Sequence, residues 1–135
     1  MKKTVSILVA MVMILSVILV PGYAFSDIGV GKQAEAITKL TGLDILKGYE
    51  DGTFKPENNI TRAEFAAMAV RFFDVEYDGP DMFSDTTRHW ASDLINKVAS
   101  AGIILGFTDG TFRPDQTISR EQMAAILYRY AQYKG

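Results

Sequence analysis

The chain has 135 residues, 14 basic and 16 acidic side chains, a formal net charge of −2 and no cysteine. This charge argues against nucleic-acid binding, which needs a basic surface that neutralises phosphates. The lack of cysteine excludes disulfides and thiolate chemistry, so stability must come from packing. The length allows one small domain or two closely associated units.

The N-terminal segment, residues 1–24, has the pattern of a secretory signal peptide. Two lysines precede an uncharged run at residues 4–20, and Pro21 and the small residue Ala24 follow. This pattern predicts export with cleavage after Ala24. The alternative is an uncleaved anchor helix, because the run is close to the shortest that can span a bilayer. Cleavage would remove two basic residues and no acidic one, leaving a net charge of −4.

The rest of the chain contains one unit twice, at an offset of 58 residues. The tripeptide FSD at 25–27 recurs at 83–85, and DGTFKP at 51–56 recurs as DGTFRP at 109–114. A repeat at fixed spacing, interrupted by a polar segment with Gly and Pro, indicates two copies of one structural unit. The predicted organisation is a signal peptide at 1–24, a first unit at 25–73, a linker at 74–81 and a second unit at 82–135.

Each unit is predicted to be a helix, an ordered loop and a second helix. Apolar residues recur at helical spacing on both sides of the loop. The loop has a short apolar stretch, an Asp-Gly turn and a proline, which indicates a compact loop with at most a brief strand pair. One amphipathic helix pair cannot bury its apolar face alone, so the two units should pack together in a mostly α-helical bundle.

The second helix of each unit begins with a capping box. Thr61 and Glu64 form the pattern T-x-x-E, and Ser119 and Gln122 form S-x-x-Q at the equivalent positions. In such a box the first side chain accepts a backbone hydrogen bond from the third helical residue, and the third side chain accepts one from the cap. The pattern therefore predicts that the helices begin at residues 62 and 120.

Both predicted helices begin with an arginine, Arg62 or Arg120, although the helix dipole disfavours a cation there. One explanation is that each arginine pairs with a nearby carboxylate such as Asp27 or Asp85. The other is that the guanidinium and the free N–H groups of the helix bind an external anion, for example a carboxylate. The sequence leaves both explanations open.

The segment "FSD…HWA…AGIILGFTDGTFRPDQTISREQMAAILYR" is similar to an S-layer homology repeat. The segment "ILKGYEDGTFKPENNITRAEFAAMAVR" resembles the same motif and includes its TRAE signature. The resemblance covers residues 25–135. It implies a small helical bundle of pseudo-threefold type, with no enzymatic activity. It also implies non-covalent anchoring of an exported protein at the bacterial cell wall or S-layer, through secondary wall polysaccharides that typically carry a pyruvate ketal.

The resemblance also implies which residues contact the glycan. The TRAE arginine falls on Arg62 and Arg120, the loop glycine on Gly48 and Gly106, and the tryptophan of the H-W-A motif on Trp90. An indole could stack on a sugar face, whereas the first unit has lysine at the equivalent position. The complete expected glycan-binding set is Arg62, Arg120, Trp90, Gly48, Gly106, Asp27 and Asp85. Anchors of this family commonly contain three repeats, and this chain has two.

Two alternatives to glycan anchoring remain at this stage. The chain could be a protein-interaction module that completes a three-repeat bundle with another S-layer homology chain or with itself. It could also be a fragment of a larger surface protein.

Metal and catalytic sites are not expected. The loops resemble calcium-binding loops only in their glycine, because positions 1 and 12 lack acidic residues. Asp51 and Asp109 are interpreted as turn formers. His89 has no accompanying nucleophile pattern, and it is interpreted as a helix-start or surface contact beside Trp90. No cofactor is implied.

Overall fold

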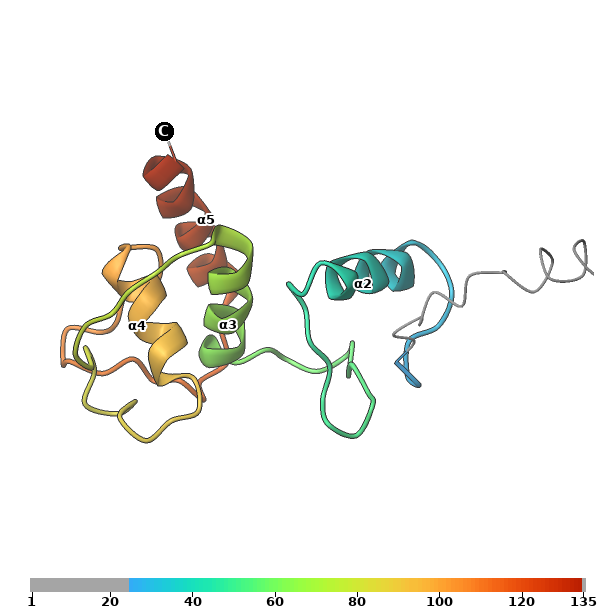
Figure 1. The fold of residues 1–135 in the computed structure, drawn as a ribbon, viewed down its shortest axis with the longest axis horizontal. Helices are drawn as coiled ribbons and strands as arrows, with labels where there is room; N and C mark the ends of the chain where they lie inside the picture. Colours follow the sequence, from blue (N-terminus) through green and yellow to red (C-terminus); the bar gives the residue numbers. More distant parts are fainter. Residues whose placement is uncertain (1–24, 135) are drawn as a thin grey trace, which may run out of the picture.

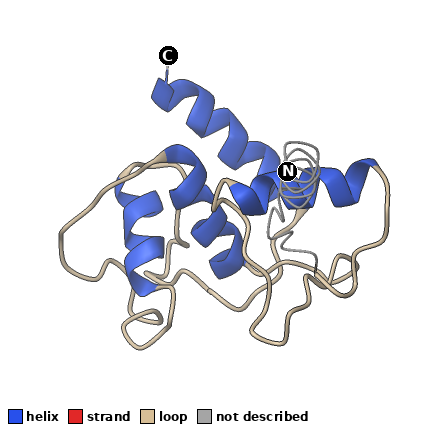
Figure 2. Ribbon diagram, turned by 45° about the vertical axis from the view of Figure 1, so that its right-hand side comes forward, coloured by secondary structure: helices blue, strands red, loops and turns tan. Residues whose placement is uncertain are grey.

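The computed structural model describes residues 25–134, and the predicted signal peptide lies outside them. Four helices follow one another along this part of the chain, connected by long ordered loops (Figures 1 and 2). They are α2 (Lys32–Gly42), α3 (Arg62–Phe73), α4 (Ser92–Ser100) and α5 (Arg120–Lys134). The prediction of a mostly helical fold is confirmed. The described residues contain no strand, only an isolated bridge between Thr61 and Thr117.

Helix α3 of the first unit packs on α4 of the second unit (Figure 1). Alanines line the buried side of α3, which allows the two helices to approach closely, and Ile95 and Val98 of α4 are fully buried against them. The core formed here contains Ala63, Ala66, Ala69, Val70, Phe73, Val75, Ala91, Ile95, Val98, Ile103, Ile104, Phe112, Ile118 and Ile126. The closest helix pair therefore joins the two units.

Helix α5 packs near the C-terminal end of α3. The rings of Phe73 and Tyr130 stack with their centroids 3.7 Å apart, and Ile126 is buried in the common core. Val75, which follows α3 in the predicted linker, is also buried there. The linker between the two units is therefore held in the core by Val75, close to the end of α3.

Helix α2 lies apart from the other three helices in Figure 1 and has no buried residue. Its apolar residues Ile37 and Leu40 are only half-buried, whereas their counterparts Ile95 and Val98 in α4 are completely buried. Helix α4 obtains its partner, α3, from the preceding unit. Among the described residues no helix packs on α2 in that way.

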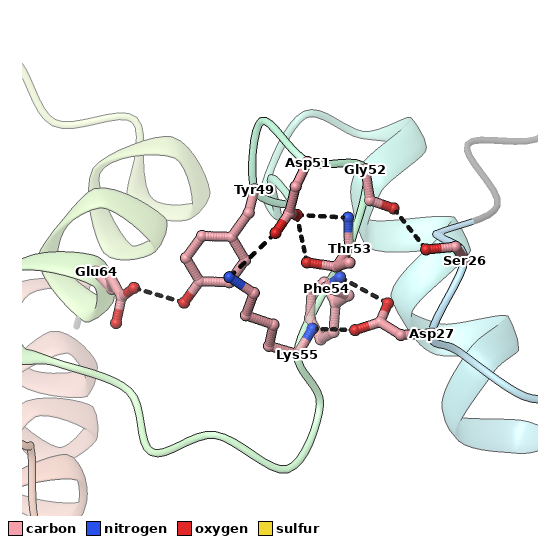
Figure 3. A network of polar contacts seen from close by, with 9 residues as sticks. All are labelled: Ser26, Asp27, Tyr49, Asp51, Gly52, Thr53, Phe54, Lys55 and Glu64. Carbon is pink, nitrogen blue, oxygen red and sulfur yellow. Dashed lines mark hydrogen bonds and ion pairs between the residues drawn. The ribbon is translucent and has the colours of Figure 1, made fainter.

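The FSD tripeptide holds the loop of its own unit in place (Figure 3). The carboxylate of Asp27 accepts hydrogen bonds from the backbone N–H groups of Phe54 at 2.8 Å and Lys55 at 2.6 Å. The N–H of Ser26 donates to the carbonyl of Gly52 at 3.2 Å. Desolvation opposes ionisation of Asp27, but these backbone hydrogen bonds outweigh it and lower its pKa.

The second unit repeats this arrangement. Asp85 accepts from the N–H groups of Phe112 and Arg113, both at 2.8 Å. The ring of the FSD phenylalanine covers the loop glycine in each unit, so that a Cβ on Gly48 or Gly106 would collide with it. Recurrence of FSD and of these glycines is therefore explained by the packing of the loops.

Both capping boxes are present. The N–H of Glu64 donates to Thr61 Oγ1 at 3.1 Å, and the N–H of Thr61 donates to Glu64 Oε2 at 2.8 Å. The equivalent bonds between Ser119 and Gln122 are both 3.1 Å. The helices begin at Arg62 and Arg120.

We expect Thr61→Ala to lower the free energy of unfolding by about 1 kcal/mol, because the N–H of Glu64 loses its acceptor. Thr87→Ala provides a matched control, since Thr87 is exposed and lies outside the helices. Urea denaturation of both variants measures the difference. Equal midpoints would show that this cap does not stabilise α3.

Candidate functional site

Arg62 extends from α3 into the second unit, where it is 3% exposed. Its Nε donates to the carbonyl of Phe112 at 2.8 Å, and its Nη2 donates to the carbonyl of Leu105 at 2.9 Å. The guanidinium carbon lies 4.5 Å from the ring centroid of Phe112. No carboxylate of the described residues forms an ion pair with Arg62. The explanation by pairing with Asp27 or Asp85 is therefore wrong for Arg62.

The first N–H groups of α3 are also bonded to the second unit. Those of Arg62 and Ala63 donate to the carbonyls of Gln116 and Pro114, both at 2.9 Å. The expectation that free helix N–H groups face an external anion is therefore wrong for α3. These carbonyl oxygens carry partial negative charge at the positive end of the helix, which offsets the cost of an arginine there.

A groove of about 220 Å³, here called the second groove, lies beside the guanidinium of Arg62. It is also lined by Gly106, Phe107, Gln122 and Arg129. Burial lowers the pKa of Arg62, and the charge of the nearby Arg113 acts in the same direction. Two carbonyls use two of the five N–H donors of the guanidinium, so the second groove borders a fixed cation with free hydrogen-bonding capacity.

A larger groove of about 560 Å³, here called the first groove, lies beside the loop of the first unit. Its walls include Gly48, Tyr49, Arg71 and Trp90. Trp90 is 64% exposed. Tyr49 is held by a hydrogen bond from its hydroxyl to Glu64 Oε1 at 2.9 Å (Figure 3). Trp90 belongs to the second unit in sequence but to the groove of the first unit in space.

The two grooves are equivalent at the repeat offset. Gly48, Tyr49, Glu64 and Arg71 of the first groove correspond to Gly106, Phe107, Gln122 and Arg129 of the second. The first groove also extends over further residues of its loop, and each groove has one residue from the other unit. The second groove contains Arg62 from the preceding unit, and the first groove contains Trp90 from the following unit.

The structure separates several residues that the sequence grouped together. Arg120 is exposed and forms no hydrogen bond or ion pair with any described residue, and it lines neither groove. Asp27 and Asp85 bind loop N–H groups in their own units. The sequence analysis did not identify Arg71 and Arg129 as groove residues. The recurrence of arginine at these two equivalent positions of the repeat was a signal that could have identified them.

His89 supports the segment that carries Trp90. Its Nδ1 accepts a hydrogen bond from the N–H of Ala91 at 3.2 Å, and its Nε2 lies 3.2 Å from Asp115 Oδ1. Its ring centroid is 5.5 Å from that of Trp90. The interpretation of His89 as a helix-start contact is confirmed.

The aspartates of the Asp-Gly turns are confirmed as turn formers. Asp109 accepts hydrogen bonds from the hydroxyl and the N–H of Thr111 and from Arg113. These bonds lower its pKa from its usual value near 3.8 to about 2, with the Thr111 hydroxyl as the largest cause.

We expect an NMR titration to give Asp109 a pKa of about 2. A depressed folded-state pKa contributes stability above the unfolded value near 3.8 and loses it as the pH falls toward the folded value. Thr111→Val should move the pKa of Asp109 upward, because the hydroxyl donor is lost. An unchanged value in this variant would contradict the assignment of its cause.

The matched pair Arg62→Ala and Arg120→Ala should differ strongly in stability. We expect Arg62→Ala to lower the free energy of unfolding by about 2–4 kcal/mol, because the buried carbonyl of Phe112 and the partly buried carbonyl of Leu105 lose a charged donor. Arg120→Ala should change it by less than about 0.5 kcal/mol, since its side chain is exposed. Chemical denaturation of both variants measures the two changes in the free energy of unfolding. Equal effects would refute a structural role that is specific to Arg62.

Comparison with known proteins agrees with this two-unit arrangement. The S-layer homology domain matches residues 24–66 and 83–124. Cell surface glycoprotein 1 of Acetivibrio thermocellus is 39% identical over 109 residues, covering 71% of this chain and 5% of that protein. The cellulosome-anchoring protein of the same organism is 38% identical over 96 residues, covering 67% of this chain and 22% of that protein. S-layer protein sap of Bacillus anthracis is 33% identical over 95 residues, covering 69% of this chain and 12% of that protein.

The chain thus corresponds to a minor part of each of these relatives' length. The match nevertheless includes both units and their FSD, loop and TRAE segments, whose roles in the fold are described above. This protein belongs to the S-layer homology domain family.

Proposed function

We propose that the chain is a non-catalytic anchoring module that attaches an exported protein to the bacterial cell wall. Its ligand in this proposal is an anionic, pyruvylated secondary cell-wall polysaccharide. Family membership supports the anchoring role, and the names of two relatives place them at the cell surface or in an anchoring function. The grooves support the choice of ligand.

The observation that carries the proposal is the exposed indole of Trp90 on the wall of the first groove. An exposed tryptophan beside an open groove offers a flat apolar face together with a polar N–H, which suits a sugar ring. Tyr49 and Arg71 provide a second aromatic ring and a cation in the same groove. A sugar stacked on Trp90 would place an acidic substituent within the groove that contains Arg71.

The second groove supplies the features needed to bind an anion. The guanidinium of Arg62 is buried without a carboxylate partner among the described residues, and Arg129 lines the same groove. A ketal carboxylate could accept hydrogen bonds from these groups, and such charge-assisted bonds are stronger than neutral ones. Two grooves on one chain could bind successive sugars of a polymer, which would increase the overall affinity.

Three carboxylates of the loops and of the α3 capping box are engaged in hydrogen bonds that hold the fold, and this supports a non-catalytic role. Asp27 and Asp85 bind loop N–H groups, and Glu64 belongs to a capping box and binds Tyr49. A glycosidase needs two carboxyl groups facing one bond, one of them as a proton donor. These carboxylates are instead occupied by hydrogen bonds that hold the fold.

We expect Trp90→Ala to weaken binding of purified wall polysaccharide by at least about 1 kcal/mol without changing stability. Tyr133→Ala is the control, because Tyr133 is 54% exposed and lines neither groove. Calorimetric titration of these proteins with native glycan and with glycan stripped of its ketal measures the contributions of the indole and of the ketal to the affinity.

Removal of the ketal should reduce binding to the protein, because the arginines lose their anionic partner. Equal affinity for native and stripped glycan would refute the anionic ligand. Equal affinity of the parent protein and Trp90→Ala would refute the role of the indole.

A further inference from the structure

The contact between the two units consists of two complementary halves. The donor half is the second helix of a unit with its first arginine, and the acceptor half is the first helix and loop of the next unit. In this structure α3 with Arg62 is the donor half, and α4 with the loop at 101–118 is the acceptor half. The acceptor half of the first unit and the donor half of the second unit are left without partners among the described residues.

The loop of the first unit has the same geometry as the loop that receives Arg62. The N–H of Tyr49 donates to the carbonyl of Thr53 at 2.8 Å, as that of Phe107 does to Thr111. Lys55 and Arg113 share a left-handed backbone conformation, with φ of 56° and 58°. The first loop is therefore already in the conformation that binds an arginine.

The carbonyls that would bind this arginine have no donor among the residues that the structure describes. Lys47 and Phe54 stand at the positions of Leu105 and Phe112, whose carbonyls bind Arg62. Within residues 25–134 the carbonyls of Lys47 and Phe54 accept no hydrogen bond. Both residues line the first groove, which is open where the second groove contains Arg62.

The apolar side of this acceptor half is also uncovered. Ile37, Leu40, Ile45 and Leu46 are half-buried, whereas the equivalent residues of the second unit are at most 1% exposed. Those equivalents are Ile95, Val98, Ile103 and Ile104. They belong to the core on which α3 packs, so a helix like α3 would cover the corresponding face of the first unit.

The donor half of the second unit is uncovered in the same way. Arg120 is exposed, and its backbone N–H and that of Glu121 donate to no described residue. Leu127 and Tyr128 are 58% and 67% exposed. Their counterparts Ala69 and Val70 are buried, so α5 presents apolar surface where α3 has a partner.

We propose that the donor half of one molecule docks on the acceptor half of a second copy, so that the protein self-associates head to tail. Arg120 would bind the carbonyls of Lys47 and Phe54, and the free N–H groups of α5 would face the carbonyls of Asn58 and Pro56. The apolar faces of α5 and α2 would be buried together. A second copy is the occupant because each molecule carries both halves of a contact that already exists within it. Such a contact is heterologous, so it forms a closed ring or an open chain.

This association does not require glycan, and it goes beyond the proposed anchoring function. The association would also change the first groove, to which the proposed function assigns glycan binding. The first groove would gain a buried arginine from the second copy, as the second groove has Arg62 from its own chain.

Sedimentation velocity of the purified protein over a wide range of concentration tests the proposal in the absence of glycan. We expect the mass to rise above that of the monomer with concentration. Arg120→Ala should abolish or strongly weaken association by removing the donor. Leu40→Glu should do so by placing a charge on the acceptor face. Arg88→Ala, an exposed arginine outside both halves, should associate like the parent protein.

Mixing the two defective variants is the decisive experiment. Arg120→Ala keeps an intact acceptor half and Leu40→Glu keeps an intact donor half, so an equal mixture should form a one-to-one pair that does not grow further. Circular dichroism establishes that each variant is folded. Leu127→Glu and Ile37→Glu repeat the test on the same two faces if either first variant unfolds.

A monomer at every concentration would overturn the proposal. So would association that survives in both variants, because neither half would then be needed. Failure of the mixture to pair would show that the contacting surfaces are not these two halves. Glycan binding is measured separately, so loss of the anchoring function would leave these results unaffected.

Discussion

The hydrogen bonds from Arg62 to the carbonyls of Leu105 and Phe112 are the constraint on which the two-unit structure depends. They place the start of α3 against the loop of the second unit, together with the bonds from its first N–H groups. Burying a guanidinium is costly unless its donors are satisfied. The loop must therefore present its carbonyls in a fixed geometry, and this requirement explains much of the remaining sequence.

The FSD tripeptide, the Asp-Gly turn and the loop glycine together provide that geometry. Asp85 binds the N–H groups of Phe112 and Arg113, which directs the carbonyl of Phe112 toward Arg62. Gly106 lets the Phe83 ring close over the loop. The conspicuous acidic residues of the repeat are thus part of the scaffold. In the proposed function, recognition of the ligand is left to residues on the groove walls, above all Trp90 and the arginines.

Local features were predictable from the sequence, and long-range ones were not. The capping boxes fixed the starts of α3 and α5 because their residues bond within a few positions of one another. The destination of Arg62 was missed because its acceptors lie 43 and 50 residues away along the chain. The placement of Trp90 was missed for a similar reason, since its groove is formed by the other unit. A repeat detected in sequence defines equivalent positions but not which unit contacts which.

Arg62 and Arg120 show why equivalence in sequence does not give equivalence in environment. Each directly follows the cap residue of a capping box at the start of a helix, yet one is buried and the other is exposed. In a repeat whose halves pair with neighbouring units, every internal contact uses one donor half and one acceptor half. An open row of such units therefore always retains one unpaired half of each kind, however many units it contains. Only closure of the row, or contact with another chain that carries the same halves, removes both.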